Sequence, residues 1–316
     1  MGKGRQPVPQ LYGYRLMLVF RRWIQIAATL LSNAFLLFPL TRNLYQGRLK
    51  SICVPGLNCY SCPAATGACP LGAMQSLFAN IRPSIQAGRI HIGLYVIGFL
   101  GLIGTLIGRM PCGWLCPFGF FQELVFKIPS RKYEIPRILT AGKYVFLGLF
   151  VIILPLFVVD EFGYGQTWFC KYVCAAGTLE AGIPMSGLQP QLRHLWGWLF
   201  FNKVLILLIL LVLMVFIRRP FCRMICPLGA IYSLFNRLSI FKMVYHPDKC
   251  VHCQQCYKNC PMGVRFYEGA NQPDCIRCLK CMQESCKYGA ISFEIAGIQL
   301  EMPRHKEEHP KVMSDI

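Results

Sequence analysis

Long apolar runs alternate with polar stretches through the first two thirds of the chain. Four runs are long enough to cross a bilayer as helices, because its hydrocarbon core is about 30 Å thick. They cover residues 23–40, 91–108, 143–159 and 197–217. The first lacks a small-residue cleavage site, which favours a retained anchor over a signal peptide. The pattern therefore predicts an α-helical membrane domain of four transmembrane helices over residues 23–245.

The composition agrees with a membrane protein. Hydrophobic residues make up 54% of the chain and charged residues 15%, whereas soluble domains carry about 25% charged residues. The formal net charge is +19, which taken alone is compatible with nucleic-acid binding. Because the apolar runs are so long, membrane lipid is the better-matched partner, and no nucleic acid is expected.

Lysine and arginine are distributed unevenly between the two sides of the predicted spans. Twenty-five lie at the N-terminus, between the second and third spans, or after the fourth, and seven lie in the other connections. Basic connections favour the cytoplasmic side. We therefore expect a multi-pass protein of the cytoplasmic membrane, in which residues 1–22 and the C-terminal part are cytoplasmic.

A cysteine motif recurs after the spans and indicates an internal repeat. Its copies are Cys69-Pro-Leu-Gly, Cys116-Pro-Phe-Gly, Cys174-Ala-Ala-Gly and Cys226-Pro-Leu-Gly, and six residues beyond each cysteine stand Gln75, Gln122, Glu180 and Tyr232. Three of these cysteines have a partner four residues earlier, at Cys112, Cys170 and Cys222. Because the repeat unit is two spans, the sequence predicts two parallel two-helix repeats with cysteine loops.

The C-terminal part has eight cysteines with the spacing of a two-cluster ferredoxin. Thiolates suit iron, and x2 spacing lets one tight loop place three sulfurs around a cube, with the fourth ligand coming from the other run. The predicted ligands of cluster 1 are Cys250, Cys253, Cys256 and Cys286, and those of cluster 2 are Cys260, Cys275, Cys278 and Cys281. A structural zinc module is the alternative. We expect an α+β ferredoxin domain at residues 246–293 and a solvated tail at 294–316.

The paired cysteines on the predicted cytoplasmic side suggest a further cluster inside the membrane domain. Proline suits the first position of a helix, so each Cys-Pro step places a sulfur at a helix N-terminus, where an anionic cluster is favoured. This inner set is Cys112, Cys116, Cys222 and Cys226. Four buried free cysteines at helix starts are the alternative.

Cysteines on the predicted outer face form a less regular set. By the logic of the repeat, a cluster takes four of Cys59, Cys62, Cys69, Cys170 and Cys174, and Cys53 has no assigned role. A disulfide is the alternative, because this side is the oxidising one. His91 and His194 stand at matching places before the second and fourth spans. They are candidate haem or quinone ligands, with interfacial histidines at helix ends the simpler interpretation.

These motifs resemble those of the NapH type of membrane polyferredoxin and of the C-terminal half of NosR. The resemblance rests on Cys112-Gly-Trp-Leu-Cys-Pro-Phe-Gly, Cys222-Arg-Met-Ile-Cys-Pro-Leu-Gly and the ferredoxin runs, and covers most of residues 90–290. It implies electron transfer at the cytoplasmic membrane, commonly between the quinol pool and a reductase system. A related branch, CcoG-like, is associated with metal reduction. The outer cysteines depart from the NapH pattern and suggest that electrons cross the membrane.

The preferred hypothesis is an iron–sulfur electron relay with two to four [4Fe–4S] clusters. No acid–base or nucleophilic constellation is evident, which favours a subunit of an oxidoreductase complex over a self-contained enzyme. The expected partners are membrane lipid, a cytoplasmic electron donor or acceptor, an outer-face cytochrome or flavoprotein, and quinone. The alternatives are a quinol-oxidising subunit and a maturation factor that reduces a metal or thiol.

Overall fold

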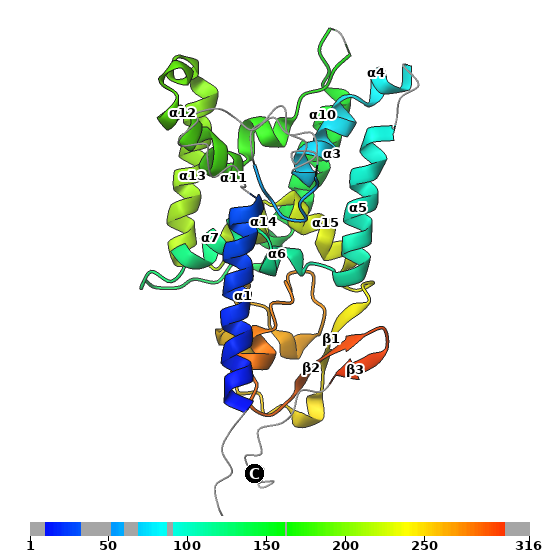
Figure 1. Ribbon diagram of the computed structural model, residues 1–316, viewed down its shortest axis with the longest axis vertical. Coiled ribbons are helices and arrows are strands. Elements are labelled where there is room, and N and C mark those ends of the chain that lie inside the picture. Colours follow the sequence, from blue (N-terminus) through cyan, green and yellow to red (C-terminus); the bar gives the residue numbers. More distant parts are fainter. Residues whose placement is uncertain (1–9, 33–51, 60–68, 87–90, 162, 301–316) are drawn as a thin grey trace, which may run out of the picture.

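The computed structural model describes residues 10–32, 52–59, 69–86, 91–161 and 163–300, and it is mostly helical with one small sheet near its C-terminal end. Its longest helices run roughly along the long axis of the molecule, and the sheet lies at one end (Figure 1). Short helices lie between the long helices and the sheet, and others lie towards the opposite end.

Two helices in the described part of the chain are long and apolar enough to cross a membrane. One is Arg137–Phe157, in which α8 (Arg137–Thr140), α9 (Gly142–Phe146), the π-helical η2 (Leu147–Ile153) and α10 (Leu154–Phe157) follow one another. The other is α13 (Trp198–Phe216). Helix α5 (His91–Ile107) contains a shorter apolar stretch, Tyr95–Ile107. These helices expose large apolar side chains, for example Leu102, Ile153 and Phe201, as a lipid-facing surface does.

The first helix differs from the first predicted span. Helix α1 (Gln10–Ser32) begins well before residue 23, and residues 33–40 of the predicted span lie outside the described residues. It packs against α6 (Pro111–Trp114) and α7 (Pro117–Val125). Its N-terminal half extends past them beside the C-terminal part (Figure 1). Apolar periodicity missed this extension because it contains arginines, two of which bind a buried carboxylate.

The short helices begin where the cysteine motif predicts. Cys69, Cys116 and Cys226 directly precede α3 (Pro70–Ala79), α7 and α15 (Pro227–Phe235), each with proline at its first position. Cys174 precedes α11 (Ala175–Gly177). Cys222 lies in α14 (Pro220–Met224). The other short helices are α4 (Ile81–Gln86), η3 (Phe169–Val173), η4 (Thr178–Gly182), α12 (Ile183–Leu188) and η5 (Pro190–Leu195).

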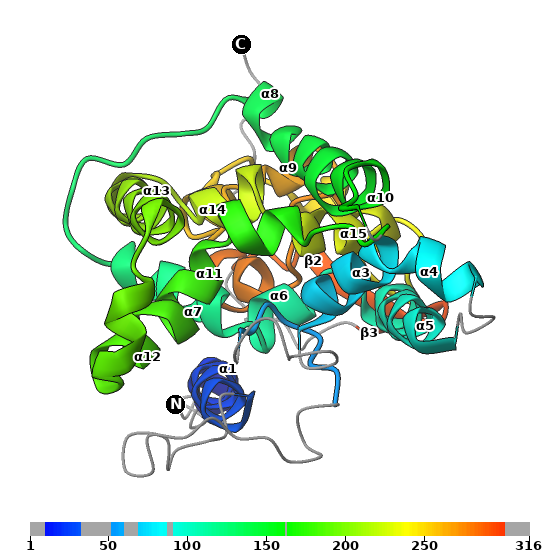
Figure 2. The ribbon, with the colours of Figure 1, turned by 90° about the horizontal axis from the view of Figure 1, so that it is seen from above.

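Viewed from above, the long helices lie around the periphery and the cysteine-bearing helices lie inside. Figure 2 shows α1, α5, α8–α10 and α13 surrounding α6, α11 and α14. This arrangement buries Cys112, Cys116, Cys174, Cys222 and Cys226 in the largest apolar core. The long helices thereby shield these thiols from the surrounding solvent or lipid.

The C-terminal part combines loops, short helices and a three-stranded antiparallel sheet in the order β1-β2-β3. Strand β1 (Phe241–Tyr245) pairs with β2 (Ile291–Ile295), with Phe241 opposite Ile295, and β2 pairs with β3 (Ile298–Leu300). The sheet therefore begins before the expected boundary at residue 246 and continues past residue 293. Between β1 and β2 lie η6 (Pro247–Lys249), α16 (Gln255–Lys258), η7 (Phe266–Glu268) and η8 (Cys281–Ser285).

Candidate metal centres

The eight ferredoxin-type cysteines lie around two neighbouring cavities. Cys250, Cys253, Cys256 and Cys286 line one of them, together with Tyr245 and Phe266. The other is lined by Cys260, Cys275, Cys278 and Cys281, and Cys256 reaches it as well. The chain thus brings together the two groups of four that the spacing predicts, and it places the two cavities next to each other.

Both cysteine loops hold non-glycine residues in the left-handed backbone region. His252 and Gln254 have φ of 51° and 58°, and the equivalent residues Arg277 and Leu279 have φ of 47° and 59°. Each such residue costs on the order of 1 kcal/mol or more and persists only where its surroundings enforce it. The same strain on either side of the central cysteine in both runs indicates a loop shaped around something it encloses.

The donor groups fit a [4Fe–4S] cluster. The backbone N–H of Val264 donates to Cys260 Sγ, and that of Ala290 donates to Cys286 Sγ, both at 3.3 Å. Hydrogen bonds to sulfur tune the reduction potentials of such clusters. Within the described ranges, no three His, Cys, Asp or Glu side chains converge as the ligands of a single metal ion do.

The inner set is fully buried and arranged in two matching halves. Cys116 and Cys226 accept hydrogen bonds from the backbone N–H groups of Gly119 and Gly229, at 3.4 Å in both cases. Burial raises the pKa of both thiols, and the nearby Cys112 and Cys222 raise it further. Thiols gathered in an apolar core need cations or a metal to become thiolates.

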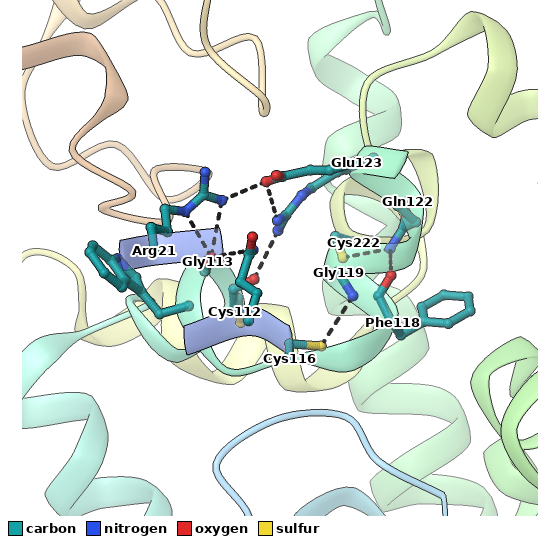
Figure 3. Close-up of polar contacts among 12 residues, drawn as sticks. Arg21, Cys112, Gly113, Cys116, Phe118, Gly119, Gln122, Glu123 and Cys222 are labelled. Atoms are coloured by element: carbon teal, nitrogen blue, oxygen red, sulfur yellow. Dashed lines mark hydrogen bonds and ion pairs between the residues drawn. The ribbon is translucent and has the colours of Figure 1, made fainter. Parts of the chain in front are cut away.

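Two glutamines at the repeat offset bind sulfur in the opposite half. Gln122 Nε2 donates to Cys222 Sγ at 3.0 Å, as Figure 3 shows. Towards the other end of the molecule, Gln75 Nε2 donates to Cys170 Sγ at 3.1 Å. Each glutamine stands six residues after one cysteine and contacts the leading cysteine of the matching copy in the other half, two copies further along the chain.

A pair of arginines that sequence reasoning missed crosses between the halves of the inner set. Arg109 Nη2 donates to the carbonyl of Cys222 at 2.6 Å, and Arg219 Nη1 donates to the carbonyl of Cys112 at 2.8 Å. Both side chains are almost completely buried. Each arginine stands three residues before the leading cysteine of its own half, and this repeated offset is the signal that would have identified them.

Glu123 forms ion pairs with three arginines beside the inner set, and Figure 3 shows its contact with one of them, Arg21. Arg21 and Arg22 of α1 reach its carboxylate at 2.6 and 2.8 Å, and Arg219 reaches it at 2.5 Å. Arg21 also donates to the carbonyl of Gly113, between the inner cysteines. Burial alone would raise the pKa of Glu123, but the three guanidiniums lower it to about 2. The carboxylate is therefore ionised and ties α1 to the inner set.

The C-terminal part docks directly on the inner set. Trp114 Nε1 donates to the carbonyl of Arg277 at 3.1 Å. A Cβ on Gly113 would lie 2.7 Å from the carbonyl oxygen of Ile276, so only glycine permits this approach. Arg109 also pairs with Asp274 at 3.0 Å. These contacts place the loop of cluster 2 against the loop of the inner set.

The outer cysteines gather at the other side of the inner set. A Cβ on Gly177 would lie 3.2 Å from Cys59 Sγ and 3.7 Å from Cys174 Sγ, so these two thiols are neighbours. Burial raises the pKa of Cys174 to about 12, with Cys69 contributing to the rise. Cys170 joins through Gln75. Cys62 lies outside the described residues.

A short segment, residues 52–59, runs from the inner set to the outer one. Cys116 Sγ lies 3.9 Å from the carbonyl of Leu57, and Tyr232 donates to the carbonyl of Pro55 at 3.2 Å. At the other end, the backbone N–H of Cys59 donates to Glu180 at 2.7 Å. Burial raises the pKa of Glu180 to about 8. Cys53 of the same segment is buried, and Cys69 contributes to its raised pKa.

Of the two candidate histidines, His194 is not brought into these sets. His194 is exposed on η5, and His91 is the first residue of α5, with its side chain outside the described ones. Lys203 of α13 lies close enough to Cys174 to act on its charge. A role for His91 and His194 in binding haem or quinone remains a prediction.

Two family models described as 4Fe–4S binding domains match the chain. One matches residues 90–136 and 199–243, which contain the inner set, and the other matches residues 243–266, which contain the first ferredoxin run. The matched ranges therefore contain cysteines that the structure brings close together. The molecule is therefore an iron–sulfur protein of ferredoxin type, and its cofactors are [4Fe–4S] clusters.

Curated relatives narrow the assignment. The chain is 32% identical over 225 residues to the uncharacterized protein MJ0749 of Methanocaldococcus jannaschii, covering 70% of this chain and 79% of that protein. It is 27% identical over 230 residues to the putative electron transport protein YccM of Escherichia coli, covering 70% and 59%. It is 27% identical over 175 residues to the regulatory protein NosR of Stutzerimonas stutzeri, covering 54% and 22%.

No solved structure matches the chain. With these relatives and the 4Fe–4S models together, the chain belongs to the membrane polyferredoxins of the NapH and NosR type.

Proposed function

We propose that this protein relays electrons across the cytoplasmic membrane through four iron–sulfur sites. When bound, a [4Fe–4S] cluster supplies reversible one-electron transfer. The proposed ligands are the two ferredoxin groups of four, the inner set Cys112, Cys116, Cys222 and Cys226, and an outer set. The observation that carries the proposal is the unbroken series of contacts between the walls of these sites.

Three sets of contacts make up this series, each linking one site to the next. Cys256 lines both ferredoxin cavities. Trp114 and Gly113 join cluster 2 to the inner set through Arg277 and Ile276. Residues 52–59 join the inner set to Cys59 and its neighbours. No solvent-exposed gap has to be bridged between one set of contacts and the next, because most of the residues concerned are buried or half-buried.

The outer set that this geometry favours is Cys59, Cys69, Cys170 and Cys174. Cys59 and Cys174 are neighbours, and Cys69 contributes to the raised pKa of Cys174. Cys170 accepts a hydrogen bond from Gln75 of α3. Cys62 remains an alternative ligand to Cys59. Cys53 lies buried nearby and is not assigned to a cluster.

The proposed topology has four transmembrane helices as two parallel repeats, with the ferredoxin domain in the cytoplasm. Contacts between the two halves support it. Arg109 and Arg219 each donate to a cysteine carbonyl of the other half, and Gln75 and Gln122 of the first half donate to cysteine sulfurs of the second. The charge distribution supports the orientation, because the basic connections flank the C-terminal part. A cytoplasmic donor or acceptor and an outer-face redox protein are then the partners, and the protein itself is a relay subunit.

The decisive experiment uses the purified full chain in sealed vesicles, with its ferredoxin clusters facing out and reduced by dithionite. We expect a trapped, membrane-impermeant acceptor inside to reoxidise them, and Cys174→Ala to stop this reoxidation while iron at the ferredoxin clusters is retained. Reoxidation that survives removal of Cys69, Cys170 and Cys174 together would refute the relay. Reduction of the clusters by menaquinol alone, without transfer to the acceptor, would support a quinol-oxidising subunit instead.

A further inference from the structure

A cavity of about 550 Å³ lies where the C-terminal part meets the helices, and it shares Val264 with the cavity of cluster 2. Its walls come from the start of the apolar helix Arg137–Phe157, the residues after α13, and the loop 263–274. Figure 2 shows α8, α9 and α14 side by side at this place. Because the cavity lies at the ends of both long apolar helices, it lies at the depth of lipid headgroups.

The cavity is strongly basic. Seven of its lining residues are lysine or arginine, and three are glutamate or aspartate. All three acids already have cationic partners: Glu268 pairs with Arg137 and Arg265, Glu134 with Arg265, and Asp274 with Arg109 and Lys143. Within the described residues, Arg218, Arg223 and Arg237 have no carboxylate partner. The cavity therefore has uncompensated positive charge.

Arg223 is the least satisfied of these cations. Its side chain is nine-tenths buried, and its Nε has no hydrogen-bond partner within the described structure. Its Nη1 lies 3.5 Å, and Arg218 Nη1 lies 3.7 Å, from the position that a Cβ on Gly263 would occupy. The two guanidiniums thus lie near each other at this glycine, and Arg218 Nη1 donates to the carbonyls of Tyr257 and Cys260. A buried guanidinium nitrogen without a hydrogen-bond partner is costly, so its retention here indicates a ligand.

We propose that this basic cavity binds a phosphate group. Guanidinium groups bind phosphate oxygens through paired N–H donors, and Arg218, Arg223 and Arg237 can supply them. Basic pockets between membrane helices are suited to anionic headgroups. The phosphate is carried by an anionic phospholipid or by a soluble phosphate compound, and these two sources share the same chemistry. Tyr144 and the first turn of the apolar helix border the cavity and provide a wall for a glycerol backbone.

Native mass spectrometry of the full chain with its clusters tests the proposal. Protein from nanodiscs of phosphatidylglycerol and phosphatidylcholine is compared with protein from phosphatidylcholine alone, and inorganic phosphate is titrated into each. We expect phosphatidylglycerol or phosphate to bind, and Arg223→Gln to weaken that binding by about tenfold, the loss of one charge-assisted hydrogen bond. Arg237→Gln, at an exposed position, repeats the test should the buried variant fold poorly.

Arg131→Gln is the matched control, because Arg131 is an exposed arginine of the neighbouring loop that does not line the cavity. Retained phosphatidylglycerol that phosphate does not displace assigns the site to lipid, and competition by phosphate assigns it to soluble compounds. Equal binding by Arg223→Gln, Arg237→Gln and Arg131→Gln, or no binding in any arm, overturns the proposal. A shift of cluster potential in Arg223→Gln with unchanged phosphate binding also overturns it, since the arginine would then serve the cluster alone.

Discussion

At the scale of single residues, the inner and outer sets each receive a hydrogen bond to sulfur from a different glutamine. Gln122 donates to Cys222 of the inner set, and Gln75 donates to Cys170 of the outer set, at nearly the same distance. A donor beside sulfur stabilises the more negative, reduced form of a cluster. The two glutamines are therefore matched probes of two different sites.

Replacing Gln122 with leucine is expected to lower the reduction potential of the inner cluster by about 40 mV, which corresponds to one net hydrogen bond of about 1 kcal/mol in a one-electron couple. A redox titration followed by EPR measures it. Gln75→Leu should shift a different signal by a similar amount. If both variants shift the same signal, the two glutamines do not serve separate clusters.

Glu123→Gln is expected to destabilise the protein by about 3–5 kcal/mol, because it leaves the buried Arg21 and Arg219 without their counter-charge. Thermal unfolding in detergent measures the loss. Glu134→Gln is the control, since Glu134 is exposed and its ion pair with Arg265 is long, at 3.6 Å. That change should cost less than about 1 kcal/mol. Equal effects would mean that the ion pairs of Glu123 do not stabilise the fold more than an exposed ion pair does.

Sequence reasoning identified the cysteines and the offset of the glutamines but missed Glu123 and its arginines. The cysteines were visible because metal-ligand spacing is local in sequence. Arg109 and Arg219 were counted only as orientation signals, since a basic residue at the end of a span ordinarily faces water. Their burial depends on carbonyls more than 100 residues away, and nothing in the local pattern reveals that.

At the scale of elements, the short helices α7 and α15 position the inner thiols. Cys116 and Cys226 directly precede them, and each sulfur accepts the N–H of the glycine three residues on. The geometry repeats because both helices start with proline, whose fixed φ suits that position. The two helices therefore present equivalent sulfurs from opposite halves.

Cys116→Ala and Cys226→Ala should each remove the same amount of iron, about four atoms for a cubane. The double variant should lose no more than either single variant, because all three changes destroy one shared site. Iron and sulfide analysis of anaerobically purified protein measures this. Additive loss would mean that α7 and α15 serve separate centres.

At the scale of the whole molecule, the C-terminal part shares a buried core with the helices. Met262 and Cys278 belong to the same buried cluster as Leu71 and Phe221 of the helical part. The sequence predicted a ferredoxin domain that begins at residue 246, yet β1 precedes that position. Cysteine spacing marks the cluster loops, but it carries no information on the strand that closes the sheet from outside the motif.

Gly113→Ala should destabilise the junction by about 1–3 kcal/mol, because its Cβ would press on the carbonyl of Ile276 at 2.7 Å. We expect the variant to keep its iron and to slow reoxidation of the ferredoxin clusters in the vesicle assay. Gly98→Ala is the control, since nothing lies within 4 Å of a Cβ there. It should leave the rate unchanged and gain up to about 1 kcal/mol of helix stability. Equal rates in the two variants would place the electron path elsewhere.

The reciprocal hydrogen bonds of Arg109 and Arg219 bear on how the two repeats evolved. Each donates to the carbonyl of the other half's cysteine, and this reciprocity is the signature of an isologous contact between two identical subunits. A half-length ancestor with a single Arg-x2-Cys-x3-Cys-Pro unit has half of the inner thiols and an arginine whose acceptor belongs to a second copy. Such an ancestor fits a homodimer, and gene duplication followed by fusion would turn that dimer into this single chain while freeing each half to diverge, as Gln122 and Tyr232 have.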